Sequence, residues 1–166
     1  YLEASEEYER ATELNPKTPG AYSNWGLALK DLAERTKSGS EAEKLYNEAL
    51  DKYQEAIKYK LDYHEAYYNW GNALIYLAQI KSDSEAEGLY EEAIEKYQQA
   101  IKYGAYSYNL ACLYALRNRK EEALKYLDRT LSRGDVSEKL VEEDNDWEAL
   151  RDDPDFKRLL AQYRGK

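Results

Sequence analysis

Residues that build disulfides and metal sites are nearly absent from this sequence. Its 166 residues include one cysteine, Cys112, one histidine, His64, and no methionine. A single cysteine cannot form a disulfide within the chain, and a structural zinc site takes about four cysteine or histidine ligands. Glycine-rich phosphate loops and calcium-loop spacings do not occur either. We therefore expect no disulfide, no metal site and no other cofactor.

Long apolar stretches and clusters of positive charge are scarce as well. No part of the sequence approaches the run of about 20 apolar residues that a helix needs to cross a bilayer. The formal net charge is −9 and the sequence pI is about 4.8, whereas binding to nucleic acid needs clustered lysine and arginine. These features predict a soluble, cytoplasmic protein whose partners are neutral to basic proteins or peptides. They argue against nucleic acid and membrane partners.

What the chain has instead is 18 tyrosines and a long internal repeat. The segment "GAYSNWGLAL", which begins at Gly20, returns as "EAYYNWGNAL" at Glu65. The segment "KSGSEAEKLYNEALDKYQEAIKY" from Lys37 returns as "KSDSEAEGLYEEAIEKYQQAIKY" from Lys81. Each unit is about 45 residues long, a period that is typical of helical repeat proteins.

Within each unit, apolar residues recur at helical spacing, which predicts two amphipathic helices per unit. Thr18 before Pro19 has the pattern of a helix N-cap followed by proline at the first helical position. Capping boxes are predicted at three further helix starts: Asp62 with Glu65, Ser40 with Glu43, and Ser84 with Glu87. The short polar turns "KSGS" and "KSDS" favour antiparallel packing of the two helices that they join.

Two motifs identify the kind of repeat. The first helices carry Tyr22-x2-Trp25-Gly26-x2-Leu29 and Tyr67-x2-Trp70-Gly71-x2-Leu74. The second helices carry Ala49-x3-Tyr53-x2-Ala56 and Ala93-x3-Tyr97-x2-Ala100, and a third unit carries Leu110-Ala111-x2-Tyr114 and Ala123-x3-Leu127. These motifs resemble the signatures of the two helices of the tetratricopeptide repeat family. The resemblance implies an all-α fold, a right-handed superhelical solenoid of antiparallel helix hairpins.

The spacing between the two motifs differs among the units. The third unit has the family's usual separation, 12 residues from Ala111 to Ala123, whereas 23 residues separate Gly26 from Ala49 in the first unit. The corresponding separation in the second unit is 22 residues. Three helical turns take about 11 residues. We therefore expect both helices of the first two hairpins to be elongated, without an irregular loop between them.

The repeat pattern divides the chain into an array and a cap. The array covers residues 1–134, with an unpaired second helix at 1–15 and hairpins at about 18–60, 62–103 and 104–133. The unpaired helix is indicated by Ala4, Tyr8 and Ala11, which have the spacing of a second helix. Residues 135–166 form a helical cap, because a solenoid needs its last apolar face covered. Trp147 and Phe156 are its largest apolar residues, and Asp153 before Pro154 starts its final helix.

Glycine and asparagine are unusual residues in the middle of a helix. A helical glycine costs about 1 kcal/mol relative to alanine, so Gly26 and Gly71 indicate that another helix approaches closely. Asn24, Asn69 and Asn109 occupy equivalent places in the three first helices, although asparagine favours caps and turns. In the tetratricopeptide family the first helices line a concave groove, which implies that these amides contact the backbone of a bound peptide. A structural hydrogen bond between adjacent hairpins is the alternative.

The predicted function is protein–protein interaction, with an extended peptide or a partner helix in the groove. The candidate groove residues are Asn24, Leu27, Lys30, Tyr68, Asn69, Asn72, Tyr76, Tyr108, Asn109 and Cys112. Lys30 is the one basic residue among them, so a clamp for a terminal carboxylate is not expected. The alternative function is self-association, in which another copy covers the unpaired N-terminal helix. We do not expect an enzyme, because His64 lies in a turn and Cys112 has no second histidine as a base.

Overall fold

The computed structural model describes the backbone of residues 2–165 and the side chains of residues 5–165. Every regular element in this described part is a helix. The helices form two compact units, unit 1 with residues 1–105 and unit 2 with residues 106–166. The prediction of an all-α fold is confirmed.

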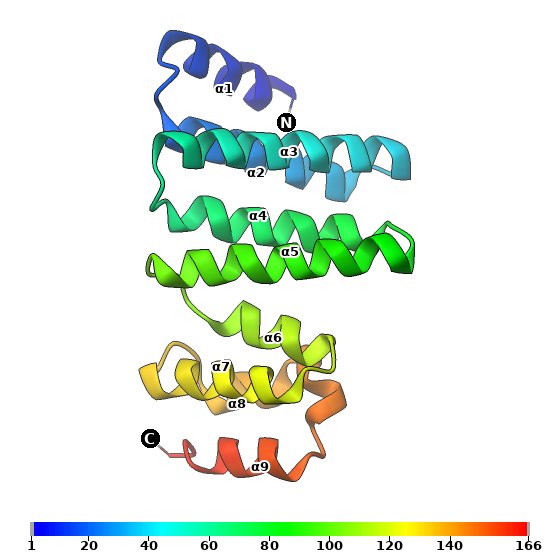
Figure 1. The fold of residues 1–166 in the computed structure, drawn as a ribbon, viewed down its shortest axis with the longest axis vertical. Helices are drawn as coiled ribbons and strands as arrows, with labels where there is room; N and C mark the ends of the chain where they lie inside the picture. The colour runs from blue at the N-terminus through cyan, green and yellow to red at the C-terminus, as the bar shows by residue number, and fades with distance from the viewer. Residues whose placement is uncertain (1, 166) are drawn as a thin grey trace. The chain divides into compact units, whose positions relative to one another are not determined.

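Unit 1 consists of helices joined by short turns. They are α1 (Leu2–Leu14), α2 (Pro19–Arg35), α3 (Gly39–Tyr59), α4 (His64–Gln79) and α5 (Asp83–Lys102). Helix α2 packs along α3 and helix α4 packs along α5, so each pair forms a hairpin, and α3 also contacts α4 (Figure 1). Helix α1 packs on α2. The elongated helices of the two hairpins agree with the extra residues in their repeats.

Unit 2 contains a shorter hairpin and the C-terminal helices. Its elements are α6 (Tyr108–Leu116), α7 (Lys120–Arg133), α8 (Glu138–Glu143), the 3-10 helix η1 (Asn145–Leu150) and α9 (Pro154–Ala161). Helix α6 packs along α7, η1 packs on α6, and α9 contacts α7. The predicted boundary between the repeat array and the cap at residue 134 stays a prediction, because the compact units group helices by packing and not by repeat.

Two of the helix starts agree with the capping residues that the sequence predicts. Thr18 is the N-cap of α2, with Pro19 at the first helical position. Asp153 is the N-cap of α9, and its carboxylate accepts hydrogen bonds from the backbone N–H groups of Asp155 and Phe156.

The capping boxes at the other three starts were predicted wrongly. Helix α3 starts after Ser38, whose hydroxyl accepts a 3.4 Å hydrogen bond from the backbone N–H of Glu41. Helix α5 likewise starts after Ser82 and not at Ser84. The spacing of serine and glutamate occurs twice in each of these turns, so the spacing alone does not identify the cap. At α4 the N-cap is Tyr63, because the helix begins one residue later than the predicted Asp62 cap requires.

The two helical glycines admit a tyrosine ring from the second helix of the same hairpin. A Cβ atom at Gly26 would lie 2.7 Å from a ring carbon of Tyr53, and one at Gly71 would lie 2.8 Å from a ring carbon of Tyr97. Both tyrosines are buried. The prediction of close helix approach at these glycines is confirmed, and its cause is the tyrosine ring.

The tryptophans lie next to these contacts and are half-buried. Trp25 and Trp70 pack against the apolar cluster that contains Tyr53. The ammonium of Lys52 lies 3.7 Å from the ring centroid of Trp25, and that of Lys96 lies 4.0 Å from the ring centroid of Trp70. Lysines from the second helices therefore cover the outer faces of both indoles by cation–π contact.

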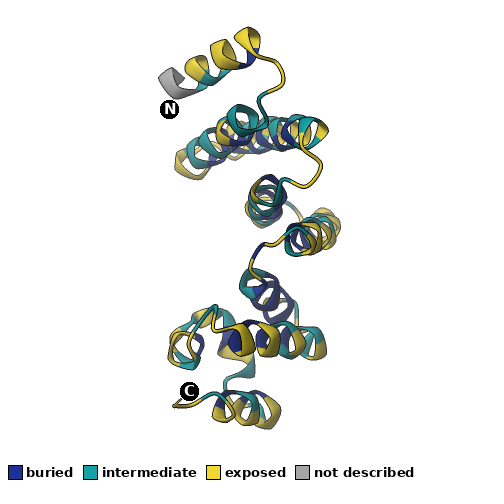
Figure 2. Cartoon of the chain, turned by 90° about the vertical axis from the view of Figure 1, so that its left-hand side faces the viewer, coloured by how far each residue is buried: buried dark blue, intermediate teal, exposed yellow. Residues whose placement is uncertain are grey.

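The residues whose spacing indicated helix α1 differ in their burial. The side chain of Ala4 lies outside the described residues, Tyr8 is half-buried, and Ala11 is exposed. Thr12 is buried, and the hydroxyl of Ser5 accepts a 2.7 Å hydrogen bond from the indole N–H of Trp25. The side of α1 that faces α2 therefore carries hydroxyl groups, and Ala11 lies outside it. Figure 2 shows the buried sides of α2 to α5, in dark blue, opposite their exposed yellow sides.

Candidate functional site

The predicted groove residues of unit 1 lie on α2 and α4. Asn24 is exposed and Asn69 is half-buried. Neither side-chain amide makes a hydrogen bond to another described residue, so each offers both donor and acceptor groups to a ligand. Leu27 is half-buried on α2, and the roles of these residues in binding stay predictions.

Two other predicted groove residues of α4 support the neighbouring helix. The carbonyl oxygen of the Asn72 side chain accepts a 2.6 Å hydrogen bond from the hydroxyl of Tyr97. The ring of Tyr68 packs at a tilt against that of Tyr97, with 5.7 Å between the centroids. Tyr68 and Asn72 thus position Tyr97, the tyrosine whose ring lies against Gly71.

Lys30 is engaged by residues of its own helix. Its ammonium pairs with Asp31 at 2.9 Å and with Glu34. Burial acts to lower the pKa of Lys30, but hydrogen bonds to Glu34 and Asp31 outweigh it, and the pKa is raised. The ammonium also lies 5.2 Å from the ring centroid of Tyr76. Lys30 therefore stays charged and holds Tyr76 from one side.

Tyr76 borders a hollow in unit 1 that the sequence analysis did not predict. The ring of Tyr46 lies parallel to that of Tyr76, with 6.4 Å between the centroids and 3° between the planes. The hollow has a volume of about 430 Å³. Its lining consists of Ala33, Glu34, Thr36, Lys37, Gly39, Ala42, Tyr46, Tyr76, Gln79 and Ile80. The extra length of the two hairpins was the signal for this site, because every lining residue lies in one of the two lengthened intervals.

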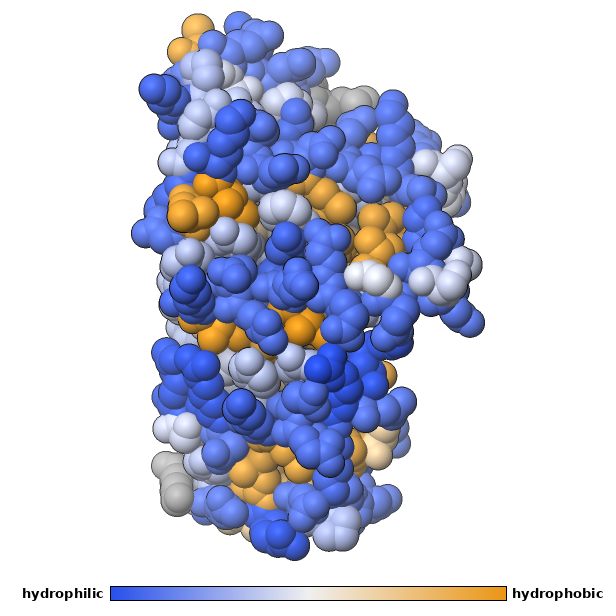
Figure 3. All heavy atoms as spheres, in the orientation of Figure 1, coloured by the Kyte–Doolittle hydropathy of each residue, from blue (hydrophilic) through white to orange (hydrophobic). Residues whose placement is uncertain are grey.

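Apolar surface is divided on the face of the molecule drawn in Figure 3. Apolar side chains, in orange, lie there in several separate patches among hydrophilic residues. Tyr76 and Ile80 are among the exposed large hydrophobic residues, at 38% and 44% exposure.

Two of the predicted groove residues of unit 2, Tyr108 and Cys112, lie against residues of the cap. The hydroxyl of Tyr108 donates a 2.7 Å hydrogen bond to the Asp144 carboxylate and accepts a 3.2 Å hydrogen bond from the indole N–H of Trp147. Cys112 is buried at 5% exposure, and Asn109 is half-buried. The expectation that Tyr108 and Cys112 line an open groove is therefore corrected. The cap binds the same face of α6, because a solenoid must bury its last apolar surface.

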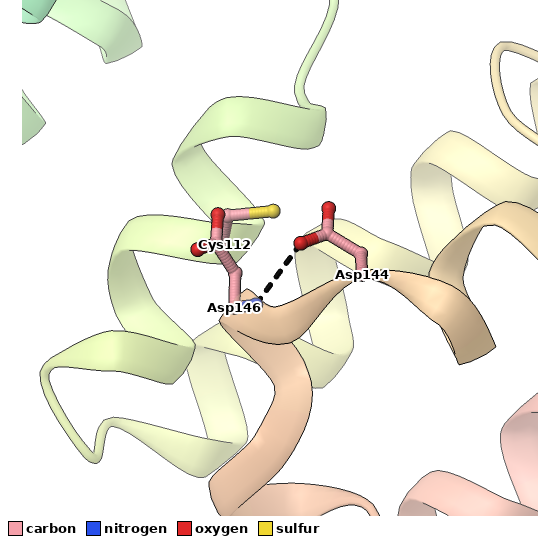
Figure 4. Close-up of side chains that lie close together, drawn as sticks. All are labelled: Cys112, Asp144 and Asp146. Atoms are coloured by element: carbon pink, nitrogen blue, oxygen red, sulfur yellow. Dashed lines mark hydrogen bonds between the residues drawn. The ribbon is translucent and has the colours of Figure 1, made fainter.

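A thiol and two carboxylates meet where the cap contacts α6. Cys112, Asp144 and Asp146 each offer one ligand atom, and these atoms lie within 4.8 Å of one another (Figure 4). The carboxylate of Asp144 also accepts a 3.0 Å hydrogen bond from the backbone N–H of Asp146. Sequence spacing did not reveal this cluster, because the cysteine and the two aspartates come from segments far apart in the chain.

Burial controls the protonation of this cluster. Burial raises the pKa of the Cys112 thiol, and the negative charges of Asp146 and Asp144 raise it further. The pKa of Asp146 is also raised. Burial is the largest cause, and the neighbouring negative charge of Asp144 is the second. Metals bind the thiolate form of cysteine, and the three donors are one fewer than a structural zinc site uses. It is the one group of this kind among the described residues.

Comparison with known proteins identifies similar sequences and folds. Residues 1–110 match the model of the family described as the plant-specific mitochondrial import receptor subunit TOM20. No curated protein matches the chain. Among solved structures, YrrB, described as a TPR protein with an unusual peptide-binding site, matches at 20% identity and a TM-score of 0.67. The match covers 95% of this chain and 72% of that of YrrB.

The structural match concerns the fold, since the identity is low. It confirms the prediction that the chain has the tetratricopeptide fold, a solenoid of helix hairpins. Within the described residues, no helix has the length and apolar character required to span a membrane.

Proposed function

Since the chain belongs to the family of the plant-specific mitochondrial import receptor subunit TOM20, we propose that it is a receptor for targeting segments of proteins that enter mitochondria. The family match covers residues 1–110, which include both elongated hairpins. We therefore assign binding to unit 1, along the first helices α2 and α4.

The observation that carries this proposal is the distribution of charge. Of the 33 acidic residues, 20 lie in residues 1–105, together with 12 of the 24 basic residues. Unit 1 thus has a net charge of −8, out of −9 for the whole chain. Mitochondrial targeting segments are amphipathic, rich in arginine and poor in acidic residues. Opposite charge favours their encounter with unit 1 and supports the predicted basic partner.

The groove residues of unit 1 suit the peptide backbone and the apolar side of such a targeting segment. Asn24 and Asn69 present unsatisfied amides on the two first helices, and an amide matches the donors and acceptors of a peptide. Tyr76 and Ile80 add exposed apolar surface on α4. A segment with one basic and one apolar side therefore meets both kinds of contact on this unit.

Binding without catalysis and an intracellular location are parts of the proposal. The raised pKa of the Cys112 thiol keeps it protonated, and a protonated thiol is a poor nucleophile. His64 lies at the start of α4 with its Nε2 atom 3.9 Å from the carboxylate of Glu65. Among the described residues, neither Cys112 nor His64 has the partner that nucleophilic catalysis requires.

Fluorescence anisotropy with a labelled synthetic peptide tests the receptor function. The probe is an amphipathic, arginine-rich helix-forming peptide without acidic residues, and its control has the same composition in an order that removes the apolar side. We expect the full chain to bind the amphipathic peptide more tightly than the control. Affinity should fall with added salt, because exposed charges are screened within about 8 Å at physiological ionic strength. Equal affinity for both peptides would refute the proposal.

Self-association is a second candidate, favoured by the exposed end of α1. Leu14 is 89% exposed, and Ala11 on the same helix is exposed as well. A second copy of the chain would cover this surface. Analytical ultracentrifugation tests this candidate. If the chain associates through α1, its molar mass should rise with concentration, and Leu14→Glu should reduce this rise. A constant monomer mass at high concentration would exclude this candidate.

A further inference from the structure

The hollow beside Tyr76 is a product of the elongated hairpins. Its lining comes from the end of α2, the following turn, the start of α3 and the end of α4. The intervals from Gly26 to Ala49 and from Gly71 to Ala93 contain all of it, and these intervals carry about three extra helical turns relative to the third unit. The hollow therefore lies beyond the part of the first helices that contains Asn24 and Asn69.

The hollow has a preformed aromatic wall. The ring of Tyr76 stacks on the parallel ring of Tyr46 of α3, and the ammonium of Lys30 of α2 lies 5.2 Å from its centroid. Tyr76 remains 38% exposed, and Ile80, the C-cap residue of α4, is 44% exposed. A tyrosine with a fixed ring offers a large contact area at a small loss of conformational entropy. A volume of about 430 Å³ is within the range of ligand pockets.

The charges around the hollow select the kind of occupant. Lys30 is shared between Asp31 and Glu34, and Lys81 is shared between Glu43 and Glu85. Each lysine compensates one of its two carboxylates, so each group has a net charge of −1, and Glu34 of the first group lines the hollow. Lys37 is a single opposing cation in the lining. An apolar group that is flanked by positive charge complements this arrangement.

We propose that the hollow is a subsite for the apolar side chains of one turn of a basic amphipathic helix bound to unit 1. This inference rests on the proposed receptor function and adds to it a site outside the asparagine-lined groove. Tyr76 and Ile80 contact the apolar side chains, and the net negative charge of the groups around Lys30 and Lys81 attracts the basic residues that flank them.

Two glycines provide a matched pair for the test. Gly39 starts α3 and lines the hollow, whereas Gly88 lies in α5 outside it. A Cβ atom at either glycine would have no heavy atom within 4 Å, so both tolerate a larger side chain. Gly39→Leu adds a bulky side chain to the lining of the hollow, and Gly88→Leu is the control. A second pair is Tyr76→Ala, with Tyr106→Ala as the control at a tyrosine that is 68% exposed in unit 2.

The experiment measures the affinity of the full chain for two labelled peptides by fluorescence anisotropy. One peptide is the arginine- and leucine-rich amphipathic helix, and the other has its two central leucines replaced by alanine. We expect wild type to bind the leucine peptide about tenfold more tightly than the alanine peptide, given the lost apolar area. Gly39→Leu and Tyr76→Ala should remove this preference, and Gly88→Leu and Tyr106→Ala should retain it. Melting by circular dichroism checks that the variants are folded.

The outcomes separate this inference from the receptor function. Failure of wild type to bind either peptide would refute the receptor function and the subsite with it. Tight binding of the leucine peptide by wild type and equally tight binding by Gly39→Leu would refute the subsite alone. Loss of the leucine preference in Gly39→Leu, with wild-type affinity in Gly88→Leu, would support it.

Discussion

Two buried polar groups of unit 1 lack a hydrogen-bond partner among the described residues, and the repeat explains both. They are the hydroxyl of Tyr53 and the indole N–H of Trp70. In the second hairpin the equivalent Tyr97 donates to Asn72, but the first hairpin has Leu27 at the position of Asn72. One leucine in place of a polar residue therefore leaves the Tyr53 hydroxyl unsatisfied.

A leucine also takes the place of the hydrogen-bond partner of the tryptophan. The indole N–H of Trp25 donates to Ser5 in α1. The repeat places Leu50 of α3 at the position of Ser5, so the indole of Trp70 lacks the corresponding hydroxyl. The two similar repeats thus differ in their buried hydrogen bonds because of single leucines outside their signature residues.

Removal of the two tyrosine hydroxyls should have opposite effects on stability. Tyr97→Phe removes a made hydrogen bond and should lower the free energy of unfolding by about 1 kcal/mol. Tyr53→Phe removes a buried hydroxyl without a partner, so it should be neutral or stabilising by up to about 1 kcal/mol. Urea unfolding of both variants measures the difference. An equal loss in the two variants would contradict this account.

Asn69 is the groove residue whose role is simplest to test. Its amide makes no hydrogen bond within the described residues, so Asn69→Ala should leave the melting temperature unchanged. If the amide binds peptide backbone, the substitution removes one or two hydrogen bonds of about 0.5–1.5 kcal/mol each, a loss of about 2- to 100-fold in affinity. Anisotropy with the amphipathic peptide measures this, with Asn47→Ala on α3 as the control. A lowered melting temperature with unaltered affinity would make Asn69 a structural residue.

At the scale of helices, the hairpins use two different solutions to the same contact. The first two hairpins pair glycine on the first helix with tyrosine on the second, at Gly71 and Tyr97 for example. The third has Ala111 and Leu127 at the equivalent positions, and both are fully buried. A smaller ring-free side chain on the second helix therefore leaves room for a Cβ atom on the first.

Replacement of the glycine–tyrosine pair by an alanine–leucine pair should be tolerated only when both residues change. Gly71→Ala places a Cβ atom 2.8 Å from the ring of Tyr97 and should cost about 1–3 kcal/mol by overpacking. The double variant Gly71→Ala with Tyr97→Leu should be more stable than the sum of the single effects. A double-mutant cycle in urea measures the coupling, and Gly88→Ala is the control for helix propensity. Additive effects would show that the ring is not the obstacle.

The contact between η1 and α6 should depend on pH through Asp146. Its pKa is raised by burial and by Asp144, so the folded state holds this proton more tightly than the unfolded state. Protonated Asp146 therefore contributes to the free energy of unfolding at low pH, and this contribution is lost as the pH rises through the raised pKa. Ionised Asp146 is thus destabilising at neutral pH. Asp146→Asn should therefore unfold at higher urea than wild type at pH 7, with the difference gone near pH 3. A difference that is independent of pH would contradict this assignment.

The sequence predicts these elements better than it predicts the site. Helices and hairpins follow from apolar spacing, and the close approach at Gly26 follows from the cost of a helical glycine. The starts of α3 and α5 do not follow, because two serines in each turn satisfy the capping pattern equally well. Tyr108 and Cys112 were predicted in an open groove because repeat alignment gives the face of a residue but not what covers it. The hollow beside Tyr76 is lined by residues of three helices, so a motif within one helix does not predict it.

At the scale of the whole molecule, charge and family resemblance coincide. Unit 1 contains nearly all of the net negative charge and most of the residues that match the import receptor family. Unit 2 has a balanced charge and a cap that covers the predicted ligand face of its own hairpin. This charge distribution favours unit 1 as the binding unit of the proposed receptor.

The last prediction is that loss of the cap unfolds unit 2 and spares ligand binding by unit 1. Phe156 is 2% exposed and its ring stacks on Trp147 at 5.4 Å between centroids. Phe156→Ala should cost about 3–5 kcal/mol, a large part of the about 5–15 kcal/mol that stabilises a typical domain. Tryptophan fluorescence separates the units, because Trp147 reports on unit 2 in a chain whose other two tryptophans are replaced by phenylalanine. In that background, Phe156→Ala should shift the unfolding transition seen by Trp147 to a much lower urea concentration. The circular dichroism signal from the helices of unit 1 should persist there. Anisotropy should show unchanged affinity for the amphipathic peptide at urea concentrations between the two transitions. A single transition for all signals, or loss of peptide binding together with the Trp147 signal, would mean that the two units unfold as one and that the cap is required for binding.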